Sequence, residues 1–92
     1  MLACNLTAFA GDERVRYQTL TLKLKEAIES RRELPDGYEL TLRPAGIAHP
    51  EVTEWIGLES RCCPFLTFQF HAPSLTLTGP DGVKQILAAV FG

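Results

Sequence analysis

The sequence predicts a small α+β domain, and two patterns in it carry this prediction. Apolar residues recur at the three-and-four spacing of helices that bury one face, and elsewhere they alternate with polar residues as in half-buried strands. The expected order is helix, strand, helix, strand, strand, helix, with a small antiparallel three-stranded sheet and the helices on one face. Residues 1–92 form a single domain, because one hydrophobic core serves a chain of this length.

The first helix is expected to begin at the N-cap Asp12 and to run for about 20 residues. The segment Leu34-Pro35-Asp36-Gly37 ends it, because a residue before proline disfavours helical geometry and Asp-Gly is a turn pair. Alternation from Tyr38 to Arg43 then predicts the first strand. The apolar face of the helix consists of Tyr17, Leu20, Leu24, Ala27 and Ile28.

The second helix is expected to begin at Pro50, which suits a first helical turn, and to finish by Cys62 or Cys63 because Pro64 follows. Two strands then form a hairpin, Phe65 to His71 and Ser74 to Thr78, joined at Ala72-Pro73. The turn at residues 79–82 starts a last helix at Val83. One sheet face should bury Leu40, Leu42, Leu66, Phe68, Phe70, Leu75 and Leu77, and the other should be polar.

Composition excludes several classes of function. A net charge of −2, with Lys+Arg 9 against Asp+Glu 11, leaves no basic stripe for nucleic acid. No apolar run approaches the length of a membrane span, and the N-terminus lacks the features of a signal peptide. We therefore expect a cytoplasmic globular protein that binds neither nucleic acid nor membrane.

Three cysteines, of which Cys62 and Cys63 are adjacent, do not form a secreted disulfide framework, and in a reducing compartment they would be thiols. Glu59 precedes them by three and four residues, so its carboxylate shares a side of the helix with at least one sulfur. A carboxylate on an apolar stripe has two interpretations. Either it is partly exposed or bonded to Arg61, Arg43 or backbone amides, or it orients a thiol and accepts its proton.

The cysteines also allow two interpretations. A sulfur can fill the core as a small hydrophobe, or the pair can coordinate a soft metal with Cys4 or His71 recruited from elsewhere. The spacing lacks the Cys-x-x-Cys of zinc ribbons and thioredoxin-like sites. Neither His49 nor His71 has the setting of a nucleophile triad, and no substrate is identifiable, so the sequence favours a role other than catalysis.

The run from Trp55 to Phe70 resembles a family of small, largely uncharacterised bacterial proteins with an E-x-x-C-C-P-F-x-x-F signature. The opening residues 3–6, the turn at 34–38 and residues 78–82 match as well, so the resemblance covers nearly the whole chain. This family is sometimes found alongside mercury- and other heavy-metal-resistance functions. The resemblance implies a site formed by Cys62, Cys63 and Glu59, with Cys4 as a further member. The short Ala72-Pro73 connection departs from the longer, glycine-rich turns of that family.

Two hypotheses from different classes follow. In the first, Cys62, Cys63 and Cys4 bind a soft metal or metalloid such as mercury, copper(I), zinc or arsenite, and Glu59 orients a thiol or accepts a proton. In the second, the cysteines only pack, no metal is bound, and the protein is a structural module that self-associates as a homodimer. A redox role through a Cys62–Cys63 bond is disfavoured, because vicinal disulfides strain the intervening peptide.

Overall fold

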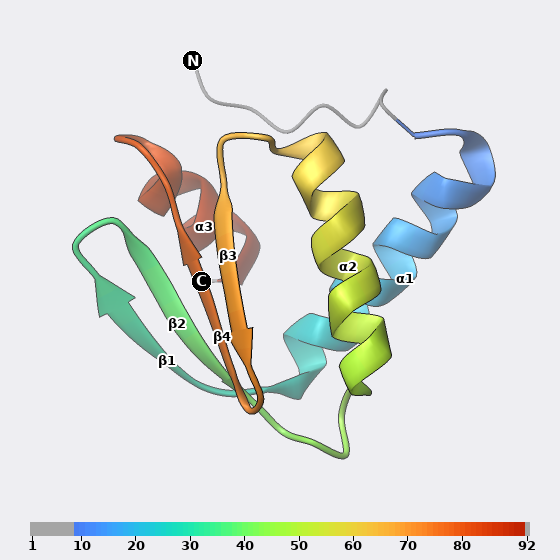
Figure 1. The fold of residues 1–92 in the computed structure, drawn as a ribbon, viewed down its shortest axis with the longest axis horizontal. Helices are drawn as coiled ribbons and strands as arrows, with labels where there is room; N and C mark the ends of the chain where they lie inside the picture. Colours follow the sequence, from blue (N-terminus) through green and yellow to red (C-terminus); the bar gives the residue numbers. More distant parts are fainter. Residues whose placement is uncertain (1–8, 92) are drawn as a thin grey trace.

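The structure, a computed structural model, describes residues 9–91 of the chain and the side chains of residues 9–89. Within this range three helices and four strands follow in the order α-β-β-α-β-β-α (Figure 1). The elements are α1 (Gly11–Ala27), β1 (Ile28–Leu34), β2 (Gly37–Leu42), α2 (His49–Cys62), β3 (Thr67–His71), β4 (Ser74–Thr78) and α3 (Val83–Phe91). The α+β class is confirmed, but the predicted three-stranded sheet and its element order are wrong by one strand.

The additional strand is β1, which occupies residues that the sequence pattern placed at the end of the first helix. The side chains between Ile28 and Leu34 are polar and exposed, so they carry no alternation from which a strand could be recognised. A two-residue turn places Leu34 opposite Gly37, and the β1 backbone then pairs antiparallel with β2. Hydrogen bonding across this hairpin overrides a local sequence that is equally suited to a helix.

The sheet is antiparallel throughout, with the strand order β1-β2-β4-β3. The predicted hairpin of β3 and β4 is confirmed, with Phe70 opposite Leu75. Leu75 is also opposite Leu40 of β2, so the two central strands bury their leucines together. The other face carries threonine, serine and glutamine side chains, and it is polar as expected. The buried leucines of the sheet are Leu40, Leu42, Leu75 and Leu77.

The helices α2 and α3 cover the leucine-bearing face of the sheet. The Trp55 ring of α2 packs edge-on against Phe68 of β3, with 5.8 Å between ring centroids. Val83 and Leu87 of α3 are buried in the same core cluster as the sheet leucines, and α3 packs against β2. The molecule therefore has one core, between the sheet and the helices (Figure 1).

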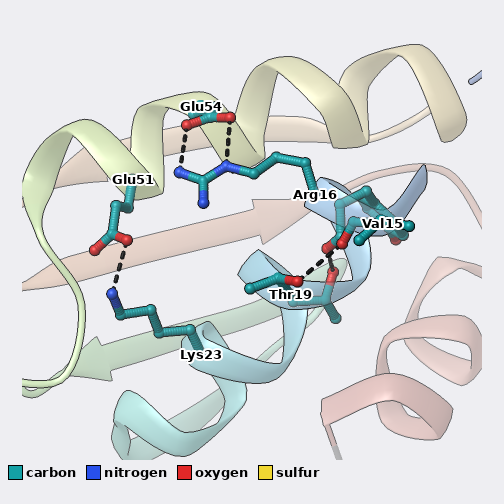
Figure 2. Close-up of polar contacts among 8 residues, drawn as sticks. Val15, Arg16, Thr19, Lys23, Glu51 and Glu54 are labelled. Atoms are coloured by element: carbon teal, nitrogen blue, oxygen red, sulfur yellow. Dashed lines mark hydrogen bonds and ion pairs between the residues drawn. The ribbon is translucent and has the colours of Figure 1, made fainter. Parts of the chain in front are cut away.

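The remaining helix, α1, packs alongside α2 and is joined to it by ion pairs (Figure 2). Arg16 donates two hydrogen bonds to the Glu54 carboxylate at 2.8 and 2.9 Å, and Lys23 donates to Glu51 at 2.7 Å. These ion pairs lie at the surface, where solvent screens the charges, so they contribute little to stability. The helices are held mainly by burial of apolar side chains, of which Leu20 and Leu24 of α1 are fully buried.

The start of α1 differs slightly from the prediction. Ala10 is the N-cap and Asp12 lies within the first turn, so Asp12 is not the capping residue. The carboxylate of Glu13 accepts a hydrogen bond from the Ala10 backbone N–H at 3.2 Å. Glu51 accepts a hydrogen bond from the Ala48 N–H at 3.0 Å in the same way at the start of α2. Both helices therefore begin with a carboxylate near their positive end.

Candidate functional site

The two adjacent cysteines lie where α2 ends. Cys62 is the last residue of the helix and Cys63 is its C-cap, with φ −126° and ψ 75°. The Cys63 backbone N–H donates to the carbonyl oxygen of Glu59 at 2.6 Å and closes the last helical turn. Pro64 cannot continue the helix. The predicted end of the helix at Cys62 or Cys63 is confirmed.

The sulfurs of Cys62 and Cys63 lie 3.7 Å apart, and both residues are completely buried. They belong to the same core cluster as Trp55 and Leu66. Cys62 is not in a disulfide, whereas Cys63 is disulfide-bonded. The expectation of thiols at both positions is therefore wrong for Cys63.

Glu59 lies one helical turn before the cysteines and is only 6% exposed. Burial raises the pKa of its carboxyl group, and a hydrogen bond from the Tyr17 hydroxyl partly opposes this rise. The expected bonds of Glu59 to Arg61 or Arg43 are not what the structure has. Arg61 instead pairs with Glu13 at 2.6 Å.

Tyr17 of α1 is the member of this site that the sequence pattern did not identify. Its pKa is raised by burial, next by the hydrogen bond to Glu59, and to a smaller extent by the charges of Glu59 and Cys62. The sequence placed Tyr17 on the apolar face of the first helix, which is correct. The signal that could have identified its role is its hydroxyl group, which needs a hydrogen-bonding partner when the ring is buried.

Trp55 lies one helical turn before Glu59, and its indole makes a hydrogen bond to α1. Its Nε1–H donates to the Thr21 hydroxyl at 3.0 Å, and that hydroxyl donates to the carbonyl oxygen of Tyr17 at 2.8 Å. This chain of hydrogen bonds joins α2 to the backbone of α1 at Tyr17.

The other predicted ligands are placed differently. His71 is exposed at the end of β3, on the face turned away from the helices, so it is not brought to the cysteines. Cys4 lies outside the described residues. Within residues 9–91, no three or more His, Cys, Asp or Glu side chains are grouped so that they could hold a metal ion. Of the three cysteines predicted as ligands, the structure therefore describes Cys62 and Cys63.

Comparisons with protein-family models, with curated proteins and with solved structures find no match to this chain. The resemblance to the E-x-x-C-C-P-F-x-x-F family therefore stays a prediction. In the described part of the chain, no helix has both the length and the apolar character that crossing a membrane requires. The functional argument consequently depends on the geometry at the end of α2.

Proposed function

We propose that the reduced protein binds a soft metal or metalloid ion through the thiolates of Cys62 and Cys63. The observation that supports this most directly is the 3.7 Å between their sulfurs. Two thiolates, each about 2.3 Å from one tetrahedral ion, lie about 3.8 Å apart. In the oxidised protein the two sulfurs thus have the separation that two neighbouring ligands of a single ion would have.

The same distance favours a particular coordination number. In a linear two-coordinate complex with bonds of about 2.3 Å, the sulfurs would be about 4.6 Å apart. The observed 3.7 Å fits a bent arrangement, which three- or four-coordinate ions adopt. Such an ion needs at least one further ligand, and we assign that role to Cys4. Zinc and arsenite suit this geometry better than linear mercury.

Glu59 serves as proton acceptor in this proposal. Each cysteine must lose its thiol proton when it binds the ion. Burial raises the pKa of the Glu59 carboxyl group, so its carboxylate is a stronger base than an exposed one. The hydrogen bond from Tyr17 holds that carboxylate one helical turn before the cysteines.

Two features of the site make binding conditional. The disulfide of Cys63 must first be reduced, which takes two electrons and two protons from a dithiol reductant. Both cysteines are also fully buried, so an ion reaches them only when the packing at the end of α2 opens locally. We therefore expect slow uptake by the reduced protein and none by the oxidised protein.

The test is a zinc titration of the protein after reduction with a dithiol and removal of the reductant under anaerobic conditions. A chromophoric chelator competes for zinc and reports the bound fraction. We expect the reduced chain to bind a single ion, and Cys62→Ser and Cys63→Ser each to lower the affinity by at least about tenfold.

The matched control is Ser60→Ala. Ser60 is an exposed neighbour whose hydroxyl donates to the Ile56 carbonyl oxygen within the helix, so its loss should leave zinc binding unchanged. Equal zinc affinity in Cys62→Ser and in the original protein would contradict the proposal. So would the absence of zinc binding by the reduced chain.

A further inference from the structure

A pocket of about 280 Å³ lies at the opposite end of α2 from the cysteines. It is half open to solvent and is bordered by the end of β2, the connection from β2 to α2, the first turn of α2 and the turn between β3 and β4. Most of its wall is apolar. The apolar side chains that form it include Leu42, Pro44, Ile47, Val52, Phe70 and Pro73.

Two polar side chains complete this wall, Arg43 and His49. The His49 ring stands edge-on to Phe70, with 4.8 Å between ring centroids and 83° between ring planes. This contact holds the imidazole against the apolar wall. His49 therefore adds a hydrogen-bonding group to a surface that is otherwise suited to an apolar body.

Arg43 gives the pocket its charge. It is the one Lys, Arg, Asp or Glu side chain among the residues described as lining the pocket, and no carboxylate lines it. Its Nη1 donates to the carbonyl oxygen of Glu26 at 3.5 Å, which is a neutral acceptor. None of the ion pairs among the described residues involves Arg43. A positive charge without a carboxylate partner thus lies beside an apolar cavity.

We propose that this pocket binds a small monocarboxylate with an apolar body. The body would fill the cavity, and the carboxylate would accept hydrogen bonds from the Arg43 guanidinium, whose planar donors match two carboxylate oxygens. A volume of 280 Å³ equals about nine waters at roughly 30 Å³ each, so the ligand has on the order of ten non-hydrogen atoms. Aromatic and branched-chain carboxylic acids have this size and polarity.

This proposal is independent of metal binding. The pocket involves His49 in the first turn of α2, and Cys62 is the last residue of the helix, 13 residues further along. At about 1.5 Å per residue the two sites are roughly 20 Å apart. A result at one site therefore does not decide the other, and Cys62→Ser should bind the carboxylate as the original protein does.

The test uses benzoate and its neutral isostere benzamide, with backbone amide shifts of the full chain recorded by NMR during each titration. We expect benzoate to shift the amides of Ile47, Val52 and Phe70, and to bind about tenfold more tightly than benzamide. Arg43→Gln should remove that preference while benzamide affinity stays the same. The control Lys25→Gln removes an exposed cation that does not line the pocket, and it should keep the preference.

Three outcomes would overturn the proposal. One is equal affinity of the original protein for benzoate and benzamide. Another is a preference for benzoate that survives in Arg43→Gln, because the charge of Arg43 would then play no part. The third is a set of shifted amides away from the pocket, which would place the binding elsewhere on the surface.

Discussion

At the level of single residues, Glu59 has the most unusual environment in the described part of the chain. It is the one buried charged residue found there, it lies one helical turn before two buried cysteines, and its carboxylate accepts a hydrogen bond from Tyr17. Its pKa is raised by burial, so folding favours the protonated carboxyl group. Glu13, Glu51 and Glu54 are the opposite case, since hydrogen bonds from Arg61, Lys23 and Arg16 lower their pKa values.

The variant Glu59→Gln tests the environment of this carboxyl group. The pKa of Glu59 is higher in the folded than in the unfolded protein. Below the unfolded pKa of about 4.3 the group is protonated in both states and does not lower the free energy of unfolding. As the pH rises from there through the folded pKa, the ionisation of Glu59 lowers the free energy of unfolding. Glutamine cannot ionise. The free energy of unfolding of the variant, relative to the original protein, should therefore increase with pH over this interval and level off above it.

Urea unfolding of both proteins from about pH 4 to about pH 8 measures this difference. The exposed carboxylates of Glu13, Glu51 and Glu54 lose stabilisation as the pH falls, but they are present in both proteins and cancel in the comparison. A difference in unfolding free energy that does not change with pH would show that the Glu59 pKa is not raised.

The sequence predicted correctly which residues share a side of the second helix. Glu59 and Cys62 were expected on one side of the second helix, and the structure has both buried there. The hydrogen-bonding partner of Glu59 could not be predicted, because Tyr17 comes from a helix distant in the sequence. The spacing of residues within one helix does not say which neighbouring helix packs on it.

At the level of elements, the second and third helices and the β3–β4 hairpin were predicted, because each has apolar residues at the period of its own structure. The strand β1 was not predicted, because it is an edge strand whose middle residues are charged or polar and exposed. Charged side chains on an edge strand discourage pairing with other molecules. The same property removes the alternation by which a strand is recognised.

Close approach of β2 and β4 makes Gly37 the most sensitive glycine of the sheet. A Cβ atom at this position would lie 1.8 Å from the carbonyl oxygen of Leu77, which is backbone and cannot turn away. We expect Gly37→Ala to lower the free energy of unfolding by about 2–4 kcal/mol. Chemical denaturation measures this loss.

Gly57 in α2 provides the matched control for that substitution. It is exposed, and a Cβ atom there would meet nothing within 4 Å. Gly57→Ala should therefore raise the free energy of unfolding by about 0.5–1 kcal/mol, because alanine is the better helix former. Similar stabilities of Gly37→Ala and Gly57→Ala would contradict the close packing of β2 against β4.

At the level of the whole molecule, α2 carries a different candidate function at each end. Its first turn borders the pocket of Arg43, and its last residue begins the pair of cysteines. The helix is held between them by its buried face against the sheet and α1. A homodimer and a cytoplasmic location stay predictions of the sequence, since a single chain bears on neither.

The central claim is that Cys62 and Cys63 together ligate a single ion. X-ray absorption spectroscopy of the reduced full chain loaded with one equivalent of zinc tests it most directly, because the spectrum counts sulfur ligands and gives their distance. We expect at least two sulfurs at about 2.3 Å, with one fewer in Cys62→Ser and in Cys63→Ser. A zinc shell of nitrogen and oxygen alone, or a sulfur count unchanged by either substitution, would contradict the claim.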